Sequence, residues 1–284
     1  MTHAELTAAA AGVWAAVAKP DRIAVGNAAI VDLGAQTLVV DTHVSPAAAR
    51  ELRAAAEELT GRPVSWVLNT HWHGDHVLGN GEFTGATIVS TTRTRELIAT
   101  VGAERLEARK EALDEELQAE LERLDAAGDE EGVRLLEEYA RELPSLAPRL
   151  PDETFDRDRD FGGAQALTLG GGHTERDSVL LVPDASVLVA GDLVVVGMQP
   201  WAGHGDPAAW ARILERLLEL QWETVVPGHG PVSGREVIEP LRDYLLALDE
   251  AVREGVELPD RFREWGQPEM WERNVAALRG TIER

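Results

Sequence analysis

Short apolar runs separated by turn residues make up the first part of the chain. Three of them, VWAAVA, AAIVDL and TLVVDT, are divided by Gly-Asn at 26–27 and by Gly-Ala-Gln at 34–36. Apolar and β-branched runs between such turn formers are typical of short strands that pair with their sequence neighbours. The pattern predicts an antiparallel meander over residues 13–40.

A helix and then a strand are predicted next. The segment SPAAARELRAAAEEL at 45–59 begins with Ser45 as a cap and Pro46 in the first turn, and Gly61 follows its last turn. These are the start and stop signals of an α-helix. The strand PVSWVLN at 63–69 then leads directly into a polar segment. That segment is therefore expected at the C-terminal end of a strand, where α/β proteins commonly build sites.

Helical spacing replaces the strand pattern after ATIVST at 86–91. Residues 104–142 are rich in acidic side chains, and AAGD at 126–129 separates two apolar stripes. The pattern predicts a helical hairpin, inserted over about 95–150, whose charged positions form a solvated face. We expect it to pack over or beside the functional cleft or to form a homodimer contact. The first stripe consists of Leu106, Leu113, Leu117, Leu121 and Leu124.

The second half of the chain repeats the organisation of the first. The predicted elements are strands at 164–169, 178–182 and 186–193, a helix at about 207–220 capped by Asp206, and the strand ETVVPGHG at 223–230. The C-terminal segment, about 234–284, is predicted to be helical and to close the fold. We therefore expect one domain over residues 1–284.

Charge and composition limit the classes of molecule that the protein is expected to bind. The 27 basic and 50 acidic side chains give a net charge of −23, which repels nucleic-acid phosphates and anionic lipids. No apolar run reaches the roughly 18 residues of a bilayer span, and the alanine-rich segment 6–18 lacks a cleavage site and is flanked by charge. We expect a cytoplasmic protein with a small-molecule substrate and with no nucleic-acid or membrane partner.

The polar segment THWHGDH at 70–76 holds three of the eight histidines of the chain. Imidazoles buried without partners are costly, so a run this polar is not ordinary core. His71 and His73 alternate by two and are expected on one side of an extended loop, with Asp75 and His76 directly after them. Because there is no cysteine, this density of His and Asp predicts a metal site built from imidazole and carboxylate.

Three further ligand-type side chains stand at strand ends or glycine-rich turns: His173 in GGGHTERDS, Asp192 in VAGDLV and His229 in VPGHGPV. Together with THWHGDH they resemble the metallo-β-lactamase superfamily over about residues 13–232. DTHVSP and THWHGDHVLGN are similar to motifs of that family. The resemblance implies an α+β fold, a four-layered αβ/βα sandwich with the metal site at one edge of two facing sheets.

The resemblance also implies roles for these residues. The family pattern has two metal positions: His71, His73 and His173 for the first, Asp75, His76 and His229 for the second, and Asp192 bridging both. Two Zn²⁺ ions lower the pKa of a shared water towards ~7 and so supply hydroxide at neutral pH. Asp75 is expected to orient that hydroxide and to carry its proton as the catalytic acid/base.

The aspartate at position 192 indicates which branch of the superfamily the chain resembles. Antibiotic-degrading members with a zinc-ligating Cys would carry it there, so the chain looks more like the hydrolase branch that includes glyoxalase II. The run GHTERDSVLLVP nevertheless resembles the lactamase branch. Glyoxalase II itself is disfavoured, because no lysine follows His229 to provide its glutathione-binding cations.

Residues beside the ligands have weaker signals. Trp201 and His204, in GMQPWAGHGDP, are candidate substrate contacts, Trp201 as a wall and His204 as a hydrogen-bond donor. Asp41 is either an acceptor for a ligand imidazole or a strand-ending turn residue. Trp72 is expected to pack beneath the loop. Thr70 and Asn80 are expected to fix the first ligand loop, and Thr174, Asp177 and Ser178 the second.

Two functions remain open at this level. The first is a dinuclear zinc hydrolase of a small ester, lactone, thioester or amide. The alternative is an iron-dependent redox enzyme, since some members of the superfamily use a similar His/Asp set for iron or a mixed-metal centre. A nuclease is disfavoured by the charge, and a non-catalytic scaffold by the presence of all seven ligands.

Overall fold

The computed structural model describes residues 1–282, apart from the side chains of residues 113–116, 281 and 282. The chain divides into two compact units, Met1–Phe155 (unit 1) and Asp156–Arg284 (unit 2). Each unit has a β-sheet of its own and helices that pack on it. None of the helices within residues 1–282 combines the length and the apolar character needed to cross a bilayer.

Unit 1 is built on a seven-stranded sheet in which the strands lie in chain order. They are β1 (Ala4–Ala10), β2 (Val13–Ala18), β3 (Ala28–Asp32), β4 (Thr37–Val40), β5 (Trp66–Leu68), β6 (Thr87–Thr91) and β7 (Glu153–Phe155). The first four strands pair antiparallel, and β5, β6 and β7 join parallel. The predicted meander is confirmed but begins earlier than residue 13, because β1 pairs with β2.

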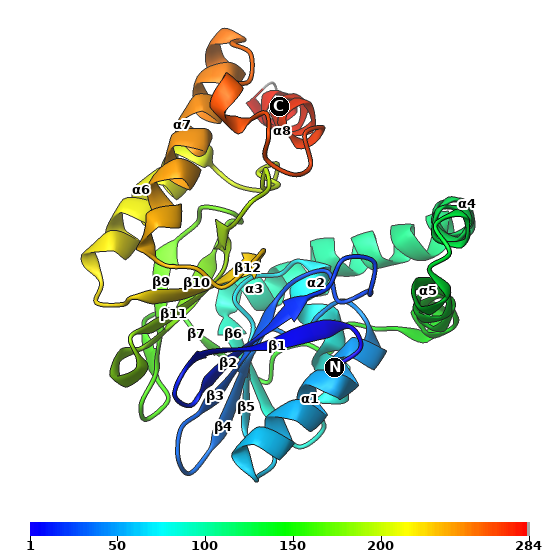
Figure 1. The fold of residues 1–284 in the computed structure, drawn as a ribbon. Coiled ribbons are helices and arrows are strands. Elements are labelled where there is room, and N and C mark those ends of the chain that lie inside the picture. The colour runs from blue at the N-terminus through cyan, green and yellow to red at the C-terminus, as the bar shows by residue number, and fades with distance from the viewer. Residues whose placement is uncertain (283–284) are drawn as a thin grey trace. The chain divides into compact units, whose positions relative to one another are not determined.

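The helix α1 (Pro46–Thr60) connects β4 to the parallel β5 and lies along the sheet (Figure 1). Its predicted signals are confirmed: the Ser45 hydroxyl accepts a hydrogen bond from the Ala48 amide at 3.1 Å, and Gly61 ends the helix at φ 68°. Leu52 and Ala56 on its inner face pack with apolar side chains of the sheet. This packing fixes the end of β5, and with it the segment that carries the first histidines.

The inserted helices form the predicted hairpin. They are α3 (Thr92–Leu97), the π-helical turn η2 (Ile98–Gly102), α4 (Ala103–Ala126), α5 (Glu130–Glu142) and the 3-10 turn η3 (Leu143–Ser145). Leu106 and Tyr139 pack with Val44 and Leu78 in a cluster separate from that between α1 and the sheet. The insertion thus packs beside the histidine segment of unit 1. The Leu113 side chain lies outside the described residues.

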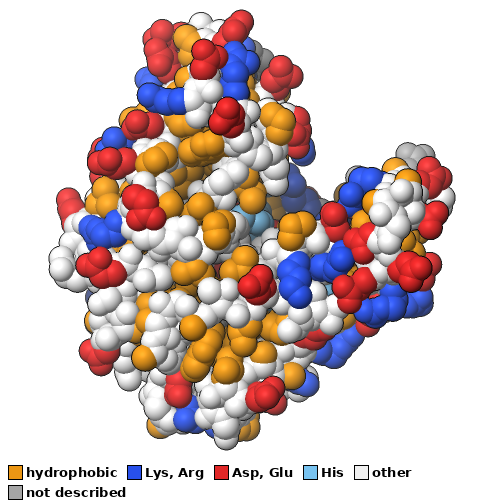
Figure 2. Space-filling view, in the orientation of Figure 1, with side chains coloured by type: hydrophobic (Ala, Val, Ile, Leu, Met, Phe, Trp, Pro, Cys, Tyr) orange, Lys and Arg blue, Asp and Glu red, His pale blue; other side chains and the backbone are white. Residues whose placement is uncertain are grey.

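Charged side chains cover the outer face of this hairpin. Basic and acidic side chains alternate over α4 and α5 in Figure 2, and Arg123 pairs with Asp21 at 2.7 Å. At the base of α5, Arg50 of α1 pairs with Glu142 at 2.6 Å. The acidic run is therefore a solvated, ion-paired face within unit 1, as its spacing predicts. A homodimer contact through it stays a prediction, as does the single domain over residues 1–284.

Unit 2 is built on a five-stranded sheet with the order β12-β11-β10-β9-β8. The strands are β8 (Arg159–Asp160), β9 (Gln165–Gly170), β10 (Asp177–Val182), β11 (Val187–Val195) and β12 (Thr224–His229). All pairs are antiparallel except β11 with β12, which are parallel. The C-terminal ends of β11 and β12 therefore reach the same edge of this sheet.

Three helices complete the core of unit 2: α6 (Pro207–Glu219), α7 (Ile238–Glu254) and α8 (Met270–Ile282). The predicted cap of α6 is confirmed, because the Asp206 carboxylate accepts a hydrogen bond from the Ala209 amide at 2.9 Å. Leu214 of α6, Leu245 of α7 and Leu278 of α8 belong to one apolar cluster with strand residues. The remaining 3-10 turns are η1 (Leu78–Glu82) in unit 1, and η4 (Pro183–Ala185), η5 (Arg235–Val237) and η6 (Asp260–Phe262) in unit 2.

Candidate metal centre

The histidine segment of unit 1 follows the buried strand β5. After Asn69 and Thr70 the chain turns into the short helix α2 (Gly74–Val77), which carries Asp75 and His76. His71 and His76 are almost fully buried, whereas His73 and Asp75 are half-buried. Parallel strands β4 and β6 flank β5. The segment therefore lies at the C-terminal end of three parallel strands, as expected for a site of this fold.

Asp41, at the end of β4, organises this segment. Its Oδ1 accepts a hydrogen bond from the Thr70 amide at 2.8 Å, and its Oδ2 accepts from the Thr70 hydroxyl at 2.7 Å. The same Oδ2 lies 2.9 Å from Nδ1 of His76. Burial raises the pKa of Asp41 above its ordinary value, although His76 and Thr70 pull it down. Of the two roles expected for Asp41, its position and contacts fit an acceptor for an imidazole, that of His76.

These contacts indicate which ring nitrogen carries the proton in two of the histidines. A carboxylate accepts hydrogen bonds, so His76 carries its proton on Nδ1 and its lone pair on Nε2. The Thr70 hydroxyl donates to Asp41 and therefore accepts from Nδ1 of His71, which lies 3.0 Å away. One carboxylate thus favours, in both buried imidazoles, the tautomer whose lone pair is on Nε2.

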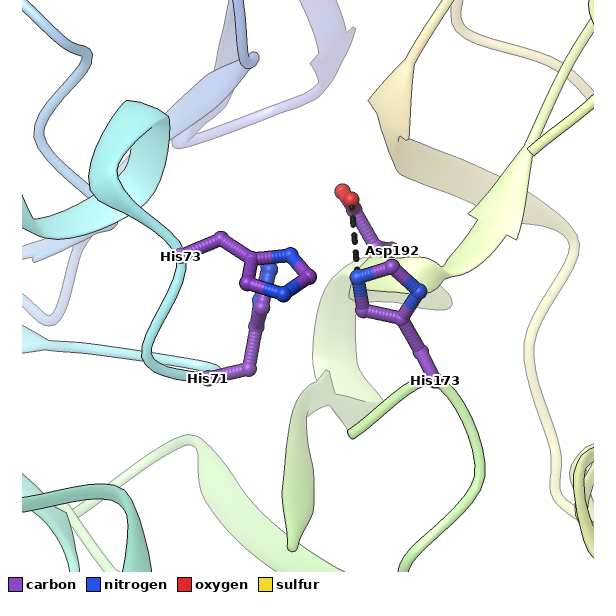
Figure 3. A group of neighbouring side chains, drawn as sticks. All are labelled: His71, His73, His173 and Asp192. Carbon is purple, nitrogen blue, oxygen red and sulfur yellow. Dashed lines mark ion pairs between the residues drawn. The ribbon is translucent and has the colours of Figure 1, made fainter. Parts of the chain in front are cut away.

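The three imidazoles of the segment lie together. The rings of His71 and His73 meet edge to face, with centroids 4.8 Å apart and an interplanar angle of 80° (Figure 3). The rings of His71 and His76 are 4.4 Å apart. Asp75 Oδ2 is 3.4 Å from His76 Nε2. All four predicted ligands of unit 1 are thus grouped within one short segment.

The environment of this segment is tightly packed. Trp72 packs with Val77 and Ile98, as predicted, although its ring also meets His73 at 4.6 Å. Asn80 donates to Asn69 at 2.8 Å and accepts from Thr42 at 3.1 Å, which confirms it as a loop anchor.

Gly26 was not predicted to matter. A Cβ there would lie only 2.7 Å from Nε2 of His76, so the backbone at this position approaches the ligand ring more closely than a side chain would allow. Nothing in the local sequence signals this approach, because it depends on how the chain before β3 folds against α2.

The ligand-type side chains of unit 2 converge on Asp192. Its Oδ2 lies 3.2 Å from Nε2 of His173, the contact dashed in Figure 3, and 3.3 Å from Nε2 of His229. Asp192 is on β11, His229 ends the parallel β12, and His173 lies in the loop after β9. Three segments that are distant in sequence therefore bring one carboxylate oxygen within reach of two imidazole nitrogens.

Asp177 holds the His173 loop. Its Oδ2 accepts hydrogen bonds from the amides of Gly172, His173 and Thr174 at 2.9, 3.0 and 3.2 Å, and its Oδ1 accepts from the Thr174 hydroxyl at 2.6 Å. Burial raises the pKa of Asp177 to about 7 against the opposing effect of these donors. The ring of His173 rests against Trp210 of α6, 5.1 Å between centroids. The predicted ordering role of Thr174 and Asp177 is confirmed.

Gly228, beside His229, is a second position that sequence reasoning missed. A Cβ there would lie 1.9 Å from Oδ1 of Asp192. Only glycine permits the backbone of β12 to approach the Asp192 carboxylate this closely. Each unit thus has one glycine pressed against one of its ligand side chains.

The candidate substrate residues Trp201 and His204 also lie in unit 2. The Trp201 indole N–H donates a hydrogen bond to Nδ1 of His204 at 3.1 Å. Both side chains are half-buried. The two residues form a pair in the segment between β11 and α6.

Comparison with known proteins identifies the family. The sequence profile of the metallo-β-lactamase superfamily matches residues 22–229, which is most of the chain and includes all seven ligand-type residues. The chain belongs to the metallo-β-lactamase superfamily.

One curated relative is the linear primary-alkylsulfatase of Pseudomonas sp. (strain ATCC 19151), 26% identical over 246 residues. The match covers 76% of this chain and 44% of the relative. The chain therefore spans less than half the length of that protein.

Solved structures of metallo-β-lactamases have the same fold. FIM-1 from Pseudomonas aeruginosa, in a mono-zinc form, matches with a TM-score of 0.63 at 17% identity, over 87% of this chain and 96% of that one. The enzyme from Hirschia baltica gives a TM-score of 0.61 at 20% identity, over 84% and 96%. The predicted fold class is confirmed: a mixed α/β protein with two sheets, of the metallo-β-lactamase type.

Proposed function

We propose that the chain is a dinuclear zinc-dependent hydrolase in which the ligand-type residues of the two units hold two metal ions. The first metal position would take His71, His73 and His173, the second would take Asp75, His76 and His229, and Asp192 would be shared by both. The observation that carries the proposal is the single Asp192 oxygen within 3.3 Å of two imidazole nitrogens. Such an oxygen is suited to a shared ligand.

The donor set fits zinc. Five imidazoles and two carboxylates, with no thiolate, match the nitrogen and oxygen ligands that Zn²⁺ takes in hydrolases. The hydrogen bonds of Asp41 and Thr70 hold His76 and His71 in the ligating tautomer. When bound, the metals supply Lewis-acid activation of water and of the substrate carbonyl.

Within this centre Asp75 is the proposed catalytic acid/base. Its carboxylate is half-buried at the start of α2, and Oδ2 lies 3.4 Å from His76 Nε2. A carboxylate so placed can hold and move a proton at Oδ2. Trp201 and His204 are proposed as substrate contacts. The substrate is a small ester, lactone, thioester or amide.

A sulfate ester is a second substrate class. The observation in its favour is the likeness to a linear primary-alkylsulfatase. Linear alkyl sulfates therefore belong in any substrate screen.

The test combines metal analysis with a substrate panel. Protein purified without added metal is expected to contain about two zinc ions per chain. The zinc-loaded protein is expected to hydrolyse at least one chromogenic ester, lactone, thioester, β-lactam or sulfate ester. Iron as the dominant metal, with no hydrolysis, would favour the redox alternative. The cytoplasmic location remains a prediction from the lack of a bilayer-spanning apolar run and of a cleavage site, and the absence of a nucleic-acid partner remains a prediction from the charge.

A further inference from the structure

The C-terminal helix α8 holds the segment that carries Trp201 and His204. The side chain of Asn274 is fully buried. Its Oδ1 accepts a hydrogen bond from the Ala202 amide at 2.8 Å, and its Nδ2 donates to the Pro200 carbonyl at 2.8 Å. These two backbone groups stand immediately before and after Trp201. One amide side chain therefore fixes the backbone on both sides of that tryptophan.

The side chain of Trp201 is held as well. The guanidinium of Arg273, next to Asn274 on α8, lies 5.8 Å from the centre of the indole ring, within the range of a cation–π contact. The indole N–H donates to Nδ1 of His204, and the two rings meet edge to face at 5.4 Å. Because Nδ1 accepts, a neutral His204 carries its proton on Nε2.

The same segment is joined to the loop of His173. The Asp206 amide donates to the Gly172 carbonyl at 3.0 Å. A Cβ at Gly205 would lie 2.0 Å from that carbonyl oxygen, so the segment is in direct backbone contact with the residue before His173. Trp201 and His204 therefore belong to the immediate surroundings of a proposed metal ligand of unit 2.

The family profile does not account for this arrangement. Its match ends at residue 229, whereas Arg273 and Asn274 lie some forty residues further along the chain. The anchor of the Trp201 segment is thus supplied by a helix outside the part of the chain that the family defines.

We propose that Asn274 is a positioning residue that holds Trp201 and His204 as a substrate-binding wall beside His173. This inference rests on the proposed hydrolase function and names the part of the chain that sets substrate affinity. An apolar group of an ester-type substrate packs on the Trp201 indole. Asn274 acts on binding and not on the chemical step, because its side chain hydrogen-bonds to the backbone that flanks the tryptophan and to the core tyrosine Tyr244.

The experiment compares Asn274→Ala with Asn274→Asp and with Leu278→Ala as a matched control. Leu278 is buried on the same helix and packs in the core of unit 2. Asn274→Ala is expected to raise KM about tenfold, the effect of losing buried hydrogen bonds, with kcat within about twofold and the zinc content unchanged. Asn274→Asp keeps an acceptor for the Ala202 amide, so its KM should lie between those of the wild type and Asn274→Ala. Leu278→Ala should lower the Tm and leave KM unchanged.

A second readout does not depend on turnover. Nitrogen-15 NMR of the imidazole reports the tautomer of His204, which is expected to be the Nε2–H form in the wild type and a mixture in Asn274→Ala. An unchanged KM in Asn274→Ala, or an unchanged His204 tautomer, overturns the proposal. If the wild type hydrolyses nothing in the panel, the proposed function fails, and the tautomer still decides whether Asn274 positions the pair.

Discussion

The two units present their ligand-type side chains in different ways. In unit 1 four of them lie within six consecutive positions, from His71 to His76. A buried carboxylate, Asp41, bonds directly to the His76 ring and reaches the His71 ring through the Thr70 hydroxyl. In unit 2 the three come from separate segments, and the corresponding carboxylate, Asp177, bonds to backbone amides. Asp41 therefore fixes the tautomers of two imidazoles in unit 1, whereas Asp177 fixes the backbone of the His173 loop in unit 2.

This difference shows which structural features hold the ligand-type side chains of each unit in place. The geometry of unit 1 is mostly local, since β5 delivers one continuous segment. The geometry of unit 2 depends on the parallel pairing of β11 with β12, which matches Gly191 with Pro227 and Val195 with His229. This pairing lets the Asp192 carboxylate reach the His229 ring. We expect substitutions in unit 2 to act through the sheet, and those in unit 1 through the imidazoles.

The largest effect is expected at Asp192. Asp192→Asn keeps the volume of the side chain but removes the negative charge that offsets the repulsion of two bound metals. The variant should fold, bind close to one zinc per chain, and lose at least about 10²-fold in kcat. Zinc analysis and steady-state kinetics measure both.

Asp206→Asn provides the control for Asp192→Asn. Asp206 is also an aspartate of unit 2, but its carboxylate caps α6. Asparagine is an equally good cap, and the backbone contact of Asp206 with Gly172 does not depend on the side chain. Two tightly bound zinc ions and near-normal turnover in Asp192→Asn would contradict the bridging role.

The next comparison sets Asp41→Asn against Asp177→Asn. An amide at position 41 cannot accept all three hydrogen bonds of the carboxylate, so His76 and His71 lose their fixed tautomers. Zinc affinity, measured by chelator competition, should fall about 10- to 100-fold, with a small change in Tm. Asp177→Asn removes acceptors from the Gly172–Thr174 backbone and should lower the Tm more than the affinity. If both variants lost zinc affinity and Tm in the same proportion, the proposed distinction between the two units would be wrong.

The two close-contact glycines provide a third comparison. Gly228→Ala places a methyl group 1.9 Å from Asp192 Oδ1, and Gly26→Ala places one 2.7 Å from His76 Nε2. Both must displace a proposed ligand, but the shorter contact requires the larger movement. We expect kcat to fall on the order of tenfold in Gly228→Ala and less in Gly26→Ala, in line with the sensitivity of active sites to small displacements. Equal kcat values in both variants and the wild type would show that activity does not require these close contacts between the glycine backbone and the proposed ligands.

The sequence predicts the local features of this molecule better than its close approaches. Ser45 and Asp206 were assigned as caps because short polar side chains before a helical stripe have few other uses, and both are confirmed. His71 to His76 were recognisable because they are contiguous. Strand ends are predicted less accurately: the pattern predicts a strand over 63–69, whereas β5 is only Trp66–Leu68.

What the sequence left out depends on contacts between distant segments. The strand Ala4–Ala10 was missed because alanine has little β propensity, and it is defined by its pairing with β2. Gly26 and Gly228 carry no local signal, since each matters only through the side chain that folds against it. The anchoring of Trp201 by Asn274 likewise joins residues that the sequence separates widely.

The last prediction concerns the acid stability of unit 1 and the buried residue His43. This residue is fully buried at a φ of 63°, and its Nδ1 lies 2.7 Å from the Gly26 carbonyl oxygen. Burial lowers the pKa of His43 from 6.5 to about 4. Between these values the unfolded chain binds a proton that the folded chain does not. The free energy of unfolding should therefore fall as the pH drops from 6.5 towards 4, by at most about 3 kcal/mol.

His43→Asn tests this prediction, because asparagine tolerates a left-handed backbone and keeps a donor for Gly26. Urea unfolding of the metal-free protein at pH 7.5, 5.5 and 4.5 should give a shallower pH dependence in the variant than in the wild type. Metal-free protein is used because acid would otherwise protonate the proposed ligand histidines and release bound metal, which would add a pH dependence of its own. Hydrogen exchange at pH 5 should place the difference in unit 1, around Gly26 and the start of α1, with unit 2 unchanged. Parallel pH profiles for the two proteins would mean that His43 does not make unit 1 the more acid-sensitive half.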